Sequence, residues 1–264
     1  MKNYFLYCCL FLPFFLNAQA TKITYKVYGV EGKPKTGVLV VNTQLVSFYS
    51  EKKADSVASE EKTVTKKGNH TYTEVKLISG GKYKNYQVYL VQADSLLNVV
   101  DIGYKEKPVK FKEKFEKIQW QFTDDTKSIS GYTCHQAKCT FRGRDYTAWF
   151  TPEIPIRIGP WKFNNLPGAI LQVYDQTKEF SWNAKSVTHL QKDQKLPDFI
   201  KHLKLFPSYK AYVEKDLYLE KKYIKQRLIR STKRKYGNNG DINIDLNDME
   251  VSHDGLERIY PWEK

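Results

Sequence analysis

Histidine and cysteine are scarce in this chain, and the few that are present form no familiar catalytic or metal-binding motif. The 264 residues include five histidines and four cysteines. The histidines are scattered along the sequence: His70, His135, His189, His202 and His253. No Gly-x-Ser-x-Gly turn marks a serine nucleophile, and no glycine-rich phosphate loop follows an expected strand. The sequence therefore identifies no catalytic residues and implies no cofactor.

Long apolar runs are also missing, except for one at the N-terminus. Lys2 precedes an apolar stretch at residues 4–16, and Ala18-Gln19-Ala20 supplies a small-x-small cleavage site. The stretch is short for a membrane span and is closely followed by polar chain. These features predict a signal peptide at residues 1–20 and export to the periplasm or beyond. The alternative is an uncleaved N-terminal anchor.

Acidic residues are outnumbered by basic ones. The chain has 43 Lys and Arg against 29 Asp and Glu, which gives a formal net charge of +14. Such an excess favours anionic surroundings such as glycolipid, membrane phosphate groups, acidic polysaccharide or nucleic acid. In the first half of the chain the lysines are spread evenly, which is typical of residues that keep β edges unpaired and the protein soluble.

Period-2 alternation of apolar and polar residues predicts many short strands. The expected strands are residues 23–28, 38–41, 45–49, 72–78, 86–91, 96–100, 110–111, 118–122, 146–151, 169–174 and 180–184. Residues 51–69 are expected to form a solvated loop with room for a short helix, and residues 124–126 a turn. The pattern predicts one mainly β (α+β) domain over residues 21–264. Its antiparallel curved sheet or half-barrel would be similar to the half-barrels of lipoprotein carriers.

A helix is predicted at about residues 208–232, with Ser208 as its N-cap. Its apolar stripe consists of Tyr212, Val213, Leu217, Leu219, Tyr223, Ile224 and Leu228. Its basic residues are Lys221, Lys222, Lys225, Arg227 and Arg230. We expect the helix to lie in the concave face or across the edge of the sheet, and to contact an anionic membrane surface or an acidic partner. Because the protein is expected to be exported, nucleic acid is a less favoured partner for this helix. The tail, which alternates at residues 242–246, should add an edge strand or remain mobile.

The middle of the chain contains several prolines and a turn motif, which restrict its backbone conformation. Pro152, Pro155 and Pro160 donate no backbone N–H and restrict the residue before each to extended conformations. Residues 151–163 are therefore expected to cross the surface as a stiff, extended segment. Leu166-Pro167-Gly168 predicts a turn in which proline fixes φ and glycine accepts a positive φ.

A hexapeptide at residues 165–170 and its surroundings carry a resemblance to a known family. Leu166, Pro167, Gly168 and Ile170 agree with a Gly-Leu-Pro-Gly-Leu-Ile signature, whereas Asn165 replaces glycine and Ala169 replaces leucine. Further agreement comes from Gly131-Tyr132-Thr133-Cys134, Ala137, Arg142-Gly143-Arg144, Tyr146, Ala148-Trp149, Ile154-Pro155, Gly159-Pro160-Trp161-Lys162-Phe163 and Asp175. The middle of the chain thus resembles the GLPGLI family of exported bacterial proteins. That family has no established activity, so the resemblance implies a location and a shape without a mechanism.

The signature region supplies the candidate binding residues. They are Arg144, Trp149, Pro155, Gly159, Pro160, Trp161, Lys162, Leu166, Pro167 and Gly168. Strand alternation separates Trp149 from Phe150, so one of these two rings should face outward beside the proline-rich loop.

Four cations in the same region have two interpretations. Arg142, Arg144, Arg157 and Lys162 could converge on an anion, because guanidinium groups suit carboxylate and phosphate oxygens. The structural interpretation is that residues 142–145 form a turn and that Arg144 pairs with an acidic neighbour such as Asp175.

Two cysteines, Cys134 and Cys139, remain after removal of the signal peptide, in a compartment that oxidises thiols. On a regular strand an odd separation places them on opposite faces and about 16 Å apart, which is too far for a disulfide. They are expected to be buried and unpaired, or joined by a strained bridge that needs a turn at residues 135–138. With His135 between them, they are also the candidate ligands of a copper or zinc site.

The leading hypothesis is a non-catalytic binding protein of the cell envelope. Its concave face or the 149–163 edge would hold a lipid-like, peptide or protein partner. The alternatives are a periplasmic metal-binding protein that uses Cys134, His135 and Cys139, and a hydrolase whose catalytic cluster is not recognisable from sequence.

Overall fold

The computed structural model describes residues 20–29, 34–42, 46–53, 60–67, 70–77, 85–90, 95–100, 108–236, 257 and 260–261. The predicted signal peptide up to residue 19, the alternating piece at 242–246 and most of the tail lie outside the described residues. Within the described part, no helix is both long enough and apolar enough to span a bilayer.

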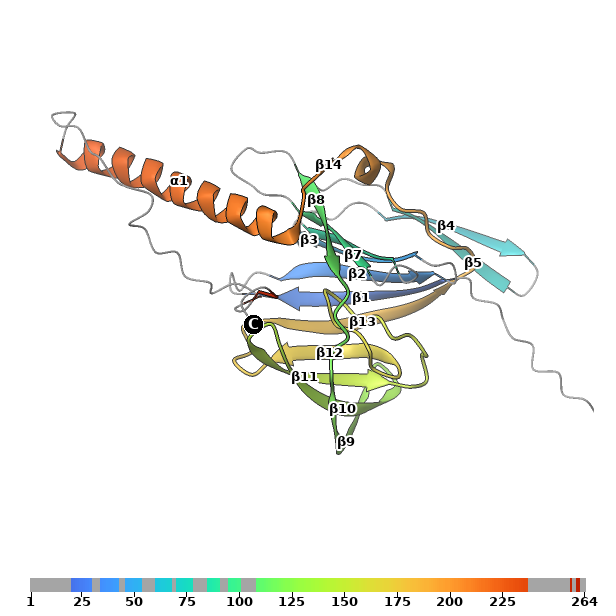
Figure 1. Ribbon diagram of the computed structural model, residues 1–264. Coiled ribbons are helices and arrows are strands. Elements are labelled where there is room, and N and C mark those ends of the chain that lie inside the picture. The colour runs from blue at the N-terminus through green and yellow to red at the C-terminus, as the bar shows by residue number, and fades with distance from the viewer. Residues whose placement is uncertain are drawn as a thin grey trace, which may run out of the picture.

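The fold is an open, curved sheet of twelve strands with a helix after it (Figure 1). The strands are β1 Ala20–Tyr28, β2 Lys35–Asn42, β3 Val46–Lys53, β4 Glu60–Lys67, β5 His70–Leu77, β6 Asn85–Leu90, β7 Ser95–Val100, β8 Val109–Lys114, β9 Gln121–Ile129, β10 Tyr132–Phe141, β11 Arg144–Thr151, β12 Ala169–Asp175, β13 Ser181–Leu190 and β14 Lys204–Leu205. A short 3-10 helix, Asp198–His202, precedes β14, and helix α1 spans Tyr209–Tyr236.

The sheet order is β14-β8-β7-β6-β3-β2-β1-β13-β12-β11-β10-β9, and β4 and β5 form a separate two-stranded sheet. All neighbours pair antiparallel except β14 with β8. The prediction of a mainly β, antiparallel, curved sheet with a C-terminal helix is confirmed.

Two segments that the sequence predicts to be a loop and a turn are strands. Residues 60–67 form strand β4 instead of a solvated loop, and their β-branched Thr63-Val64-Thr65 explains why they extend. Residues 124–126 lie inside β9, and the chain turns later, at Ser130-Gly131. Because β9 is the last strand of the sheet and most of its side chains are exposed, it tolerates the polar residues that suggested a turn.

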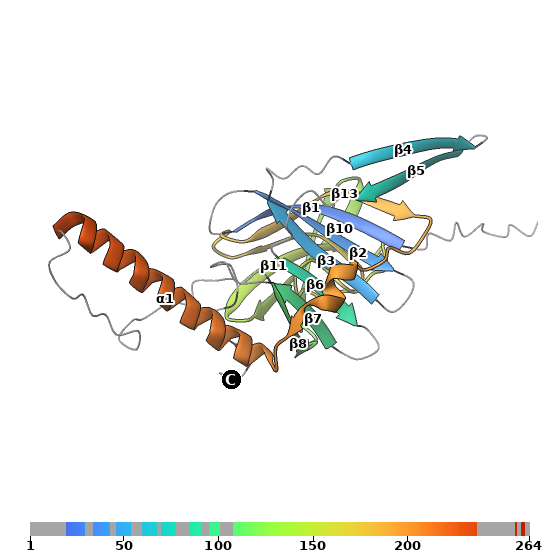
Figure 2. The ribbon, with the colours of Figure 1, turned by 90° about the horizontal axis from the view of Figure 1, so that it is seen from above.

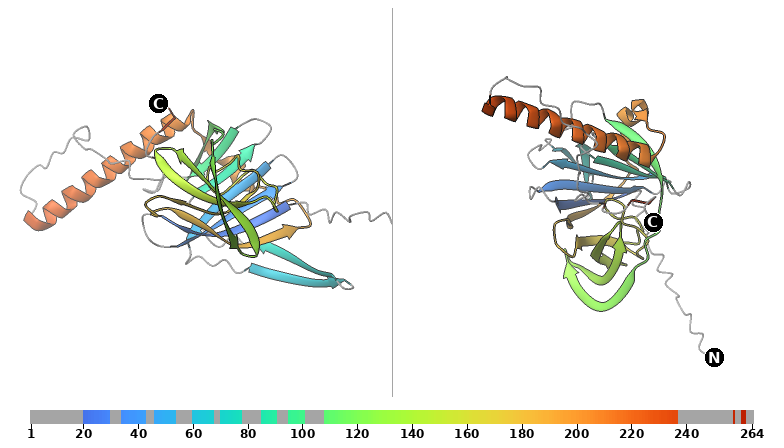
Figure 3. Two further views of the ribbon diagram at one scale, coloured as in Figure 1. Left: turned by 90° about the horizontal axis from the view of Figure 1, so that it is seen from below. Right: turned by 60° about the vertical axis from the view of Figure 1, so that its left-hand side comes forward.

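Residues 115–120 link β8 to β9, which lie near opposite ends of the sheet (Figures 1 and 3). We call residues 115–120 the crossing segment. The Asn164 amide donates to the carbonyl of Glu116 at 2.9 Å and accepts from the backbone N–H of Ile118 at 3.3 Å. Asn165 donates to the carbonyl of Ile118 at 2.9 Å, and Trp120 Nε1 donates to the Asn164 carbonyl at 2.8 Å. The crossing segment is therefore fixed against the loop between β11 and β12.

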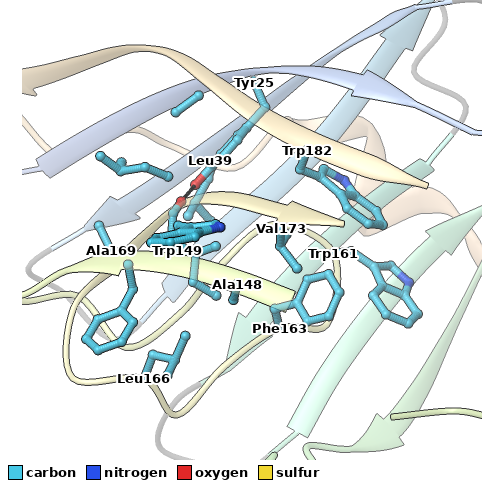
Figure 4. Packing of buried hydrophobic residues seen from close by; sticks show 14 of the residues in the cluster. Tyr25, Leu39, Ala148, Trp149, Trp161, Phe163, Leu166, Ala169, Val173 and Trp182 are labelled. Atoms are coloured by element: carbon cyan, nitrogen blue, oxygen red, sulfur yellow. Dashed lines mark hydrogen bonds between the residues drawn. The ribbon is translucent and has the colours of Figure 1, made fainter. Parts of the chain in front are cut away.

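The main core lies between the sheet and that loop (Figure 4). Tyr25 and Trp182 are each 1% exposed, and the Tyr25 hydroxyl donates to the carbonyl of Ile170 at 2.7 Å. Trp149 and Phe150 are 7% and 4% exposed, so the prediction that one of them faces outward is wrong. The pairing of β11 with β12 shifts register between these two residues, and this bulge breaks the alternation that the prediction assumed.

The loop at residues 152–168 folds back into the core instead of crossing the surface. Gly159 and Phe163 are bridged by a backbone hydrogen bond of 2.8 Å, and both are buried. The left-handed residue beside the Leu-Pro-Gly turn is Asn165, with φ of 70°, at the position where the resembled signature has glycine. Gly168 is not among the residues with positive φ, so the predicted reason for its glycine is wrong. A Cβ there would collide with the Thr151 carbonyl.

Helix α1 starts where the sequence predicts. The Ser208 hydroxyl accepts from the Ala211 N–H at 3.1 Å, which confirms the N-cap. Tyr209 and Tyr212 stack on Phe111 of β8, with ring centroids 4.9 and 4.6 Å apart. Beyond this contact the helix extends away from the sheet (Figure 2), so it lies at the edge and does not fill the concave face.

We predict that Gly168→Ala destabilises the protein by more than about 3 kcal/mol, because the added Cβ meets the backbone of Thr151, which cannot move aside. Gly29→Ala is the matched control, since its Cβ meets only Phe180 at an ordinary 3.5 Å. Urea denaturation of both variants checks this. Equal stability of the two variants would contradict the close approach at Gly168.

Candidate functional site

A cavity of about 400 Å³ lies at one end of the strands, between the sheet, the 152–168 loop and the first turns of α1. Strand pairing explains why these residues meet: Tyr28 lies opposite Ser181, Val27 opposite Lys35, and Gly37 opposite Glu51. The aromatic residues of its lining are Tyr28, Tyr49, Phe111, Trp161, Phe180, Trp182, Tyr209, Tyr212 and Tyr260. The charged residues of its lining are Lys35, Glu51, Lys162, Asp216, Glu220 and Glu257.

A hydrogen-bonded chain leads from the core to one carboxylate of the cavity. Trp182 Nε1 donates to the Tyr49 hydroxyl at 2.9 Å, and this hydroxyl donates to Glu51 at 2.8 Å. Gly37 permits this arrangement, because a Cβ at that position would come within 2.6 Å of the Tyr49 hydroxyl. Glu51 is only 8% exposed. The chain fixes this carboxylate in the wall of the cavity.

Buried ion pairs join the 152–168 loop to β8 and to the tail. Lys162 contacts Glu113 at 2.7 Å and Glu257 at 2.5 Å. Arg142 contacts Glu257 at 3.4 Å and Glu116 at 3.5 Å. Breaking such a buried pair leaves an uncompensated charge, so this cluster fixes the loop side of the cavity.

Helix α1 supplies the opposite wall. Burial, helped by the neighbouring Glu220 carboxylate, raises the pKa of Asp216 to about 6. Burial also raises the pKa of Tyr209, and the nearby carboxylates of Glu257 and Glu113 raise this pKa further. Asp216 and Glu220 are four residues apart on one helix face and both line the cavity. The wall therefore carries a carboxyl group that titrates near neutral pH.

The candidate binding residues mostly serve the core. Of the ten residues, Pro155 and Pro167 are exposed, and only Trp161 and Lys162 line the cavity; the others are buried. Trp161 has an unusual φ of 50° and stacks on Trp182 with centroids 6.1 Å apart. A bulky residue in this conformation is strained, which is a common feature of functional sites.

The four cations do not converge on a common anion site. Arg144 pairs with Asp175 at 3.0 Å, which confirms the structural interpretation of this arginine. Arg157 is exposed. Arg142 and Lys162 do meet, but they meet around the carboxylates of Glu113 and Glu257.

Cys134 and Cys139 are free thiols, and both are buried in the main core. The expectation of opposite faces fails because the pairing of β10 with β9 shifts register between His135 and Ala137. Burial raises the pKa of both thiols, to about 12 for Cys139. Among the described residues no group of three His, Cys, Asp or Glu side chains is placed to hold a metal ion. The structure therefore gives the proposed triad with His135 no support.

Sequence reasoning missed Glu51, Asp216 and Glu220. A signal was available for Asp216, which interrupts the apolar stripe between Val213 and Leu217. Glu51 ends a run of buried strand residues, and no sequence pattern shows that it faces a cavity.

The structure is an open, mainly β domain with a cavity at one end of its strands. Residues 32–206 match the family described as N-glycanase peptide, N-terminal domain, and the chain belongs to this family. No curated protein matches the chain. No finding bears on the resemblance to the GLPGLI family, which stays a prediction.

Among solved structures the chain is similar to PNGF-II in two crystal forms. The TM-scores are 0.51 and 0.49, with 15% and 14% sequence identity. The matches cover 76% and 74% of this chain but 33% and 32% of PNGF-II. The chain thus spans about a third of the length of these structures, and the likeness concerns the fold.

We predict that Asp216→Asn stabilises the protein at neutral pH. The folded-state pKa of about 6 exceeds the ordinary 3.8, so the folded protein holds this proton more tightly than the unfolded chain does. The stability that this proton gives is complete below about pH 4 and is lost as the pH rises through 6. Because Asp216 is partly exposed, the gain at pH 7.5 should be about 1–2 kcal/mol, and it should vanish at pH 3.5.

The measurement is urea denaturation of the variant and the parent at both pH values. Glu214→Gln is the control, because Glu214 is exposed on the same helix and does not line the cavity. A gain that is independent of pH would contradict the assignment to Asp216.

Proposed function

We propose that this chain is a carbohydrate-binding module that recognises the glycan part of a glycoconjugate in its cavity. One observation carries the proposal: the cavity combines many aromatic rings with carboxylates. The C–H faces of a sugar ring pack on aromatic faces, and sugar hydroxyls donate hydrogen bonds to carboxylates. A volume of about 400 Å³ lies within the usual range for a small-molecule site.

Membership in an N-glycanase N-terminal domain family supports this ligand class. An N-glycanase acts on glycans, and an N-terminal domain of such an enzyme would gain from holding the sugar. The proposal keeps the hypothesis of a non-catalytic binding protein and replaces its lipid-like, peptide or protein partner with a glycan. Export through the predicted signal peptide would place the domain where glycosylated surfaces occur.

We predict that N,N′-diacetylchitobiose, the disaccharide at the base of N-linked glycans, binds saturably and changes the tryptophan fluorescence, since Trp161 and Trp182 both line the cavity. Tyr212→Ala should weaken binding by about tenfold, because it removes an aromatic wall worth about 1–1.5 kcal/mol. Isothermal titration calorimetry provides the affinity.

Tyr218→Ala is the matched control: Tyr218 lies on the same helix, is 49% exposed and is not part of the lining. Its binding should equal that of the parent. If a fatty acid or a sugar-free peptide binds in the cavity and no oligosaccharide does, the carbohydrate proposal is wrong.

A hydrolase is the second candidate, because Asp216 is a carboxyl group whose pKa of about 6 suits a general acid near neutral pH. In this case the protein would release sugar from a glycopeptide, with a rate that falls as the pH rises above 6. Asp216→Asn would abolish the release while it preserves binding. Mass spectrometry of an incubated glycopeptide checks this, and an unchanged substrate after long incubation would leave binding as the function.

A further inference from the structure

The lining of the cavity has an excess of negative charge, whereas the chain as a whole has an excess of positive charge. The whole chain carries +14, yet four carboxylates and two ammonium groups line the cavity. Of these, Lys162 and Glu257 pair with each other at 2.5 Å. The remaining lining charges are the carboxylates of Glu51, Asp216 and Glu220, and the ammonium group of Lys35.

None of these three carboxylates has a cation within 4 Å among the described residues. Glu51 is the most informative, because it is 8% exposed and its hydrogen-bond partner in the described part of the chain is the Tyr49 hydroxyl. An ionised carboxylate has about four acceptor positions, and one is used here. A buried carboxylate with spare acceptors requires a donor, and a cationic donor matches it best.

The aromatic rings of the lining suit the same kind of ligand. The Lys162 ammonium already lies over the Tyr209 ring, 4.5 Å from its centroid, and also contacts the Glu257 carboxylate at 2.5 Å. This shows how the site accommodates an ammonium group: a ring face and a carboxylate hold it together. Phe180, Trp182 and Tyr212 offer further rings in the same lining as the three carboxylates.

We propose that the cavity is selective for a sugar that carries a free ammonium group, such as a glucosamine unit, over the N-acetylated or acidic equivalents. This inference rests on the proposed function of carbohydrate binding. Glu51 accepts a hydrogen bond from the ammonium group, and Asp216 and Glu220 form the facing negative wall. An acidic sugar would instead bring a further negative charge beside the carboxylates of Glu51, Asp216 and Glu220, which is unfavourable in a partly buried site.

The test compares two disaccharides that differ in N-acetylation and therefore in charge: chitobiose, with free amino groups, and N,N′-diacetylchitobiose. Titration calorimetry at pH 7 should give about tenfold tighter binding of chitobiose, since charge-assisted hydrogen bonds exceed neutral ones by about this factor. The preference should shrink in 0.5 M NaCl. Sialyllactose, an acidic sugar, should bind more weakly than either.

Glu51→Gln should remove most of the preference, because glutamine still accepts from Tyr49 but no longer carries the negative charge that favours an ammonium group. Should that buried variant fold poorly, the double variant Asp216→Asn, Glu220→Gln on the partly exposed helix face provides the same test. Glu214→Gln, outside the lining, is the control. Lys35→Met should increase the preference, because it removes the remaining cation.

The outcomes separate the two proposals. Equal affinity for both disaccharides, or a preference that Glu51→Gln and the double variant leave intact, overturns the charge selectivity and leaves carbohydrate binding in place. Tighter binding of sialyllactose does the same. Absence of binding to every one of these sugars overturns both proposals.

Discussion

The hydrogen bonds between Asn164-Asn165 and the crossing segment are the constraint on which the rest of the structure depends. An open curved sheet has an inner face that must be covered by other parts of the chain. Here the crossing segment and the 152–168 loop cover it, and the side chain of Asn164, which is 1% exposed, bonds to the backbone of both. The amide thereby satisfies buried backbone groups that no strand pairs, which would otherwise be costly. With the loop held in this way, Trp161 reaches Trp182, and the floor of the cavity is complete.

The same loop connects packing to electrostatics. Lys162 follows the strained Trp161, and its ammonium group binds Glu113 of β8 and Glu257 of the tail. Ion pairs of this kind add little net stability when compared with apolar packing, but they fix the relative positions of the elements they join. The ammonium group of Lys162 therefore fixes the positions of three parts of the chain relative to one another: the 152–168 loop, strand β8 and Glu257 of the tail. The strain at Trp161 persists because contacts on both sides determine its position.

Sequence reasoning predicted the class of fold and most strands, because period-2 alternation follows directly from burial of one sheet face. It failed where the backbone departs from regular pairing. The bulges at Trp149/Phe150 and His135/Ala137 place consecutive residues in the core, and alternation alone cannot locate them. Most of the candidate binding residues are buried outside the cavity, and a related reason explains why the sequence did not show this: a region rich in Trp, Pro and Gly is compatible with a surface or with a core. The cavity escaped prediction because its carboxylates come from strand β3 and helix α1, which are distant in sequence and meet only through the sheet order.

Helix α1 separates two electrostatic environments. Its first turns, with Asp216 and Glu220, face the cavity, and residues 221–236 contain eight Lys and Arg but no Asp or Glu. All acidic residues of the helix therefore lie in its first half, and most of its basic residues lie in its second half. Most of the positive charge of this helix thus lies on residues that do not line the cavity. A ligand in the cavity experiences mainly the local carboxylates, because charges more than about 10 Å away are largely screened at physiological salt. The net charge of the chain and the charge of its ligand need not be opposite.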